Sequence, residues 1–74
     1  MQILNMATIR SLILDALQKK YESDISKADA TIKVYLENPV GIGEHPEIVQ
    51  AIEMELEKLA TAEDKLNTLK KHFS

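Results

Sequence analysis

Side chains that could carry out catalysis are few in this sequence, and their spacing does not bring them together. The chain has 74 residues with two histidines and no cysteine, which excludes a thiol nucleophile, a disulfide framework and a zinc site built from thiolates. Among the serines, Ser74 alone lies close to a histidine, His72, at the end of the chain. Glu53 and Glu57 are four residues apart, so their carboxylates share an exposed helix face rather than a pocket. The sequence therefore predicts that the protein is not an enzyme.

His45 is surrounded in the sequence by Glu37, Glu44 and Glu47, and such a group could bind a metal ion or transfer a proton. A histidine metal site normally shows a fixed ligand spacing, for example H-E-x-x-H on a helix, and this stretch has none. We therefore expect His45 to lie at a helix start or in an exposed loop. We expect no metal ion and no other cofactor.

Gly41 and Gly43 flank Ile42 in a sequence that could begin a phosphate-binding loop. A dinucleotide-binding loop requires a third glycine three residues further on, where Pro46 stands, and a nucleotide P-loop requires Gly-Lys-Ser or Gly-Lys-Thr. Acidic side chains beside the next helix, such as Glu44, would also repel a phosphate. The glycines are therefore interpreted as part of a backbone turn.

Residues that interrupt helices are confined to one short segment. Both glycines and both prolines lie within residues 39–46. Pro39 disfavours a helical conformation at Asn38. Pro46 suits the first turn of a helix, because the backbone N–H that proline lacks would have no helical carbonyl partner there. The sequence thus predicts a single domain over residues 1–74, with a helix at about 6–37, a hinge at 38–45 and a helix at about 46–73.

Apolar residues recur at intervals of three and four in both segments, which predicts helices and no strand. Two such segments of similar length, joined by one short connection, can fold back on each other. The predicted fold class is all-α, an antiparallel two-helix hairpin resembling a coiled coil. Near the hinge, the pairing would place together Ile32, Tyr35, Leu36, Ile48, Val49 and Ile52. At the far end, it would place together Ile9, Ile13, Leu17, Leu66, Leu69 and Phe73.

The apolar stripe is wider than one neighbouring helix can cover. Leu12, Val34 and Leu56 cannot all face the same neighbour as the main seam. A chain this short also buries few apolar side chains by itself. We therefore expect a homodimer in which two hairpins pair into a four-helix bundle, or docking on another protein. The side chains expected at the assembly interface are Leu14, Leu17, Ile25, Ile32, Ile52, Leu59, Leu66 and Leu69.

The hinge is a second candidate for a partner surface, because it is the one segment expected to be non-helical and it combines apolar with acidic groups. The residues expected to form this surface are Val40, Ile42, Glu44 and His45.

Charge is unevenly distributed along the chain. Residues 34–57 contain six glutamates and no lysine or arginine. Residues 1–20 contain three basic residues against one acidic residue, and residues 58–74 contain four against two. A hairpin would therefore have an acidic hinge end and a basic terminal end. Such runs usually lie on solvated helix faces; alternatively, they steer a partner or favour antiparallel association of subunits.

Two alternative functions follow from this polarity. The basic end, with Lys70, Lys71 and Phe73, could bind nucleic acid through phosphate contacts and stacking. With one aromatic residue there and a net charge of −3, we do not expect nucleic acid to be the partner. The acidic hinge could instead act as an inhibitor that occupies a basic groove of another protein.

No apolar run approaches the roughly 20 residues that a membrane span requires, and the first ten residues lack the pattern of a cleavable leader. We therefore expect a cytoplasmic protein with no membrane partner.

The hinge sequence ENPVGIGEHPEI, together with the later AEDKL and the KKHF ending, resembles small helical proteins of contractile-tailed bacteriophages. The likeness covers about the second half of the chain. It implies an accessory protein that is phage-encoded and lies in the host cytoplasm or is associated with the virion. It implies no activity and no functional residues.

Overall fold

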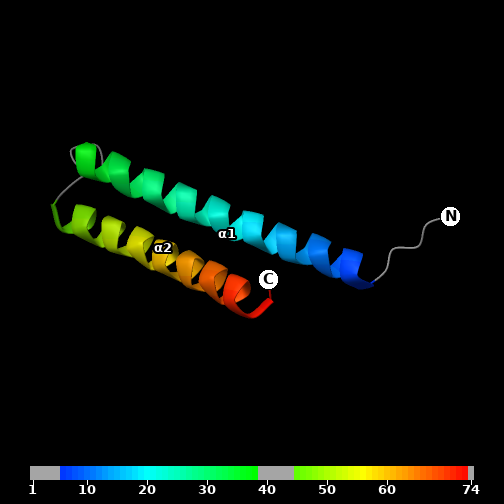
Figure 1. The fold of residues 1–74 in the computed structure, drawn as a ribbon. Coiled ribbons are helices and arrows are strands. Elements are labelled where there is room, and N and C mark those ends of the chain that lie inside the picture. The colour runs from blue at the N-terminus through cyan, green and yellow to red at the C-terminus, as the bar shows by residue number, and fades with distance from the viewer. Residues whose placement is uncertain (1–5, 39–44, 74) are drawn as a thin grey trace.

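The protein folds as a hairpin of two long antiparallel helices (Figure 1). In the computed structural model, which describes residues 6–38 and 45–73, α1 spans Met6–Glu37 and α2 spans His45–Phe73. These two stretches contain no strand. The all-α hairpin predicted from the apolar spacing is therefore confirmed.

The adjoining ends of α1 and α2 follow from the two prolines. The backbone N–H of Asn38 donates a hydrogen bond of 2.9 Å to the carbonyl of Val34, and Pro39 has no N–H with which to continue the helix. α2 begins at His45, one residue earlier than expected, so His45 belongs to the helix rather than to the hinge. Pro46 is compatible with this start, because N–H groups in a first turn have no helical carbonyl partner.

The most deeply buried side chains between the helices are small. Ala28 on α1 and Ala62 on α2 are 2% and 4% exposed, and Ile48 near the start of α2 is 9% exposed. Among the described residues, no large side chain is fully buried. Because a methyl group allows two helices to approach closely, we attribute this burial to a tight, narrow contact between α1 and α2.

The larger apolar side chains lie along the two sides of this contact. The eight that were expected at an assembly interface are all half-buried within the single chain: Leu14, Leu17, Ile25, Ile32, Ile52, Leu59, Leu66 and Leu69. The neighbouring helix already covers part of each one, so they form the seam of the hairpin itself.

The helices are not flush at the terminal end. The guanidinium of Arg10 donates a hydrogen bond of 3.0 Å to the carbonyl of Phe73, the last residue of α2. α1 continues beyond this point, as its blue first turns show in Figure 1. Ile9 and Ile13, which were expected to pack on the end of α2, are exposed, and so is the Phe73 side chain.

A similar difference occurs at the hinge end. Leu36 and Val49 were expected to pack in the seam, but they are 63% and 67% exposed. Their positions on the helices place them beside the seam instead, because each is about a quarter turn away from the buried rows.

The hairpin is a rod rather than a sphere. Its radius of gyration is 17.5 Å and its extents are 61 × 24 × 14 Å, whereas a compact domain of this length has a radius of gyration of about 11 Å. Its accessible surface is 5964 Å², whereas a compact monomer of its mass exposes roughly 4,600 Å². Much apolar surface therefore stays in contact with water.

Candidate interaction surfaces

Two surfaces run along the contact between the helices, one on each side. The first is an open groove of about 580 Å³. Its walls combine hydroxyl, charged and small side chains from both helices: Tyr21, Asp24, Lys27, Ala28, Thr31, Met54, Glu55, Glu57, Lys58, Thr61, Ala62 and Lys65.

The charges in the groove are mostly matched by neighbours. Lys58 Nζ lies 3.0 Å from the carboxylate of Glu55, and Lys65 Nζ lies 5.9 Å from the centre of the Tyr21 ring, a cation–π contact between the helices. Within the described residues no buried side-chain N or O atom lacks a hydrogen-bond partner, and no three His, Asp or Glu side chains are grouped to hold a metal ion. The groove therefore combines matched charges with apolar surface from Ala28, Met54 and Ala62.

The second surface, on the opposite side, is apolar. It consists of three exposed side chains, Leu36, Val49 and Leu56, and of Ile32 and Ile52, which are half-buried beneath them. We call these five residues the apolar edge. Val49 and Leu56 are seven residues apart, so they lie two turns apart on one face of α2. Leu36 is four residues after Ile32 on α1, which places these two side chains in one row.

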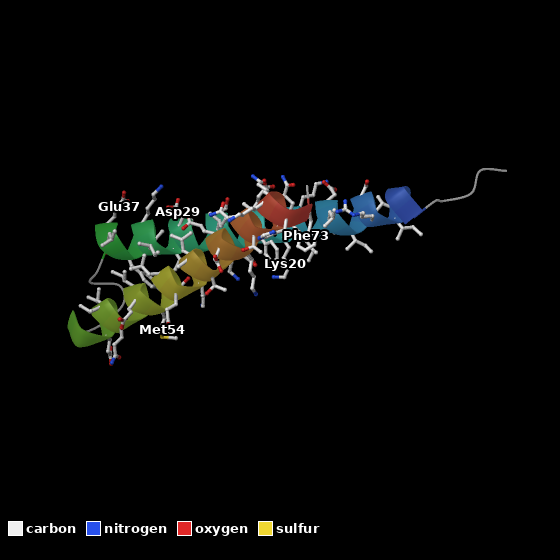
Figure 2. All side chains as sticks on the ribbon, turned by 60° about the horizontal axis from the view of Figure 1, so that its bottom comes forward. Lys20, Asp29, Glu37, Met54 and Phe73 are labelled. Atoms are coloured by element: carbon white, nitrogen blue, oxygen red, sulfur yellow. The ribbon has the colours of Figure 1, made fainter. Side chains whose placement is uncertain are left out.

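The apolar edge and the groove face opposite ways. Figure 2 draws the side chains, with Met54 on α2 and Asp29 on α1. Counted at about 100° per residue from the buried Ala28, the groove residues Lys27 and Thr31 lie on one side of α1, whereas the edge residues Ile32 and Leu36 lie on the other. Asp29 is three residues before Ile32, so it belongs to the row of the apolar edge. In the half of the rod nearest the hinge, the apolar edge therefore has no charged member, whereas the opposite side mixes charged side chains with the exposed Val34 and Met54.

Charged residues flank the apolar edge on both helices. On α1, Lys33 Nζ forms an ion pair of 2.8 Å with the carboxylate of Asp29. The hydrogen bond from this ammonium and the aspartate charge raise the pKa of Lys33 above 10.5. On α2, Glu53 lies between Val49 and Leu56 in the sequence and is exposed. The flank on α1 therefore carries a paired ammonium and carboxylate, whereas the flank on α2 carries the exposed carboxylate of Glu53.

The basic terminal end engages several of its cations within the chain. Lys19 and Lys20 form ion pairs of 2.9 Å with aspartates four residues away, and Arg10 bonds to the end of α2. These cations lie in exposed pairs, which contribute little individually. The arrangement gives the nucleic-acid alternative no specific support.

The sequence-predicted hinge surface cannot be placed on this framework. Val40, Ile42 and Glu44 lie outside the described residues, and His45 is described only as the first residue of α2. Sequence reasoning identified Leu56 as surplus to the seam but assigned Leu36 and Val49 to it. The position of Leu36 around α1, about 80° of helix rotation from Ala28, is the signal that could have placed it on the edge.

Neither α1 nor α2, over the residues described, has an apolar stretch that could cross a membrane. Comparison with protein-family models, with curated proteins and with solved structures gave no match to this chain.

Proposed function

We propose that this protein is a non-enzymatic helical interaction module that associates with a second copy of itself to form a four-helix bundle. The observation that carries the proposal is the small core: the described part of one chain buries only Ala28, Ile48 and Ala62 among its apolar residues. Domains of this size rarely gain enough stability from a single core. A second hairpin would supply the missing burial. The resemblance to phage proteins favours a role as an accessory protein in the cytoplasm of an infected bacterium.

The apolar edge offers enough surface for a concentration-dependent dimer. Its three exposed side chains keep between 51% and 67% of their surface in water. Full burial of one such side chain contributes about 1.5–3 kcal/mol, so six of them in a dimer contribute roughly 5–10 kcal/mol before costs. Association itself costs about 4–15 kcal/mol. Ile32 and Ile52 add further burial, but the gain and the cost are of similar size, so we expect a weak dimer that forms toward the millimolar end of the concentration range.

Sedimentation equilibrium over a wide concentration range tests this proposal. We expect the mass to rise from that of an 8.3 kDa monomer to twice that value between about 1 μM and 1 mM. Circular dichroism at the same concentrations should show helicity and cooperativity of unfolding rising together with the mass. A chain that unfolds cooperatively and stays monomeric throughout would refute the proposal.

A further inference from the structure

We propose that the apolar edge of one hairpin packs on the apolar edge of a second copy, with both hinges at the same end of the dimer. This inference rests on the proposed self-association and adds its contact face and its orientation. The edge is confined to the hinge half of the rod, so apolar side chains meet apolar side chains only when the two hinge halves overlap.

The register of the hairpin identifies which residues would meet. Lys65 lies over Tyr21, so these residues are level along the rod. Lys33 is twelve residues after Tyr21 on α1, and Glu53 is twelve residues before Lys65 on α2. Because the helices are antiparallel and have the same rise per residue, Lys33 and Glu53 are also level along the rod.

A two-fold axis parallel to the rod would place each α1 on the α2 of the other copy at the same level. Leu36 of one chain would then contact Val49 of the other. Lys33 on the outer flank of one edge would lie opposite Glu53 on the outer flank of the other, twice in the dimer. Each Glu53 carboxylate would then lie beside the Asp29–Lys33 ion pair of the other copy, whose ammonium would be shared between two carboxylates.

With hinges at opposite ends and the rods aligned along their full length, the apolar edge would instead face a polar surface, whereas antiparallel copies that overlap at the hinge halves alone would bring Lys33 of one copy near Lys33 of the other. Along the terminal half of the same side, α1 presents Gln18 and Glu22, joined by a hydrogen bond of 3.2 Å, and α2 presents the exposed Glu63. Burial of these groups against leucine and valine would cost free energy. At long range, however, the acidic hinge half of one copy attracts the basic terminal half of the other, which favours this second orientation. Added salt should therefore weaken a dimer with hinges at opposite ends and strengthen a dimer with hinges together.

Salt dependence distinguishes these arrangements. With the hinges together, two acidic halves repel each other. This repulsion extends over a screening length of about 30 Å at 0.01 M salt but only about 8 Å at 0.15 M salt. We expect the dimer to tighten about tenfold between these salt concentrations. A dimer that weakens as salt is added would overturn the proposed orientation.

Cross-linking provides the decisive measurement, because the chain has no cysteine of its own. We would mix a Lys33→Cys chain with a Glu53→Cys chain under mild oxidation and compare the yield with a Lys33→Cys plus Ser11→Cys mixture. We expect the first mixture to give a covalent dimer at least about tenfold faster than the second. A faster reaction of the second mixture, or of Lys33→Cys with itself, would overturn the proposed orientation.

A matched pair of variants separates this inference from the proposed function. Leu56→Ser removes an exposed leucine from the edge, whereas Leu12→Ser removes a similarly exposed leucine elsewhere on the rod. We expect the first to weaken the dimer at least about tenfold and the second less than about threefold, with helicity checked in both. If the wild-type chain dimerises but both variants dissociate equally, the contact face is wrong and the proposed function stands. If the wild-type chain never dimerises, both proposals fail.

Discussion

At the centre of the hairpin, Ala28 and Ala62 lose nearly all of their exposed surface to the opposite helix, whereas Leu36 and Leu56 on the apolar edge keep more than half of theirs. Both regions are apolar, but only the side chains of the first are covered by the opposite helix of the same chain. Small side chains at the contact let the helices approach, and this close approach leaves room for larger side chains only beside the contact. The comparison indicates that the tightness of the hairpin and its unpartnered edge have a common cause.

Opening the central contact should have the largest effect on the fold. Ala28→Leu inserts three carbon atoms where 2% of the side chain is exposed, and overpacking of this kind typically costs about 1–3 kcal/mol. We expect the midpoint of urea unfolding to fall accordingly. Ala30→Leu is the matched control, because Ala30 lies on the same helix and is exposed. An equal fall of the urea midpoint in both variants would contradict the burial of Ala28 between the helices.

A half-buried seam residue should show an intermediate effect. Leu17→Ala removes a side chain that the opposite helix partly covers, so we expect a loss of about 1–2 kcal/mol, less than for a fully buried leucine. Leu12→Ala, on the same helix but 61% exposed, should change the free energy of unfolding by less than about 0.5 kcal/mol. Unfolding measured at low protein concentration checks both values, and a larger loss for Leu12 would contradict the seam.

The link between the helix ends should contribute less. Arg10→Met removes the hydrogen bond to the Phe73 carbonyl and a positive charge near the C-terminal end of α2, so we expect a loss of about 0.5–1 kcal/mol. Arg10→Lys, which keeps the charge, should recover part of it. Hydrogen exchange of the last turn of α2 gives a local measurement, and unchanged exchange in Arg10→Met would exclude a capping role.

The smallest effect should come from the ion pairs along α1. The pKa values of Lys19, Lys20 and Lys33 lie above 10.5, because an aspartate four residues away accepts a hydrogen bond from each ammonium and attracts its charge. A raised pKa stabilises the folded state below pH 10.5, and this stabilisation disappears as the pH rises past the raised value.

Thermal unfolding of the wild-type chain and of a triple Lys→Met variant tests this pH dependence. The two midpoints should differ slightly at neutral pH and converge once the pH has passed the raised pKa values of the lysines, because each lysine is then neutral in both the folded and the unfolded chain. The difference should be small, since all three pairs are exposed. If the difference between the two midpoints instead grew with pH, the pKa values of these lysines would be lowered rather than raised in the folded state.

The arrangement of the helices follows from the sequence, whereas the depth of burial does not. Pro39 and Pro46 place the ends of the helices within about one residue, because both effects act on the local backbone. Sequence reasoning assigned the interface to leucines and isoleucines, whereas the structure buries Ala28 and Ala62 most deeply. Which member of a row is buried depends on the distance between the helices, and this distance is set by the smallest side chains on both chain segments together.

The elongated shape of the monomer affects how its assembly can be observed. A rod with extents of 61 × 24 × 14 Å migrates in gel filtration ahead of a sphere of equal mass, so elution volume alone would overstate the number of subunits. Side-by-side packing with the hinges together thickens this rod without lengthening it. Small-angle scattering should therefore report a larger cross-section and an unchanged maximum dimension as the concentration rises.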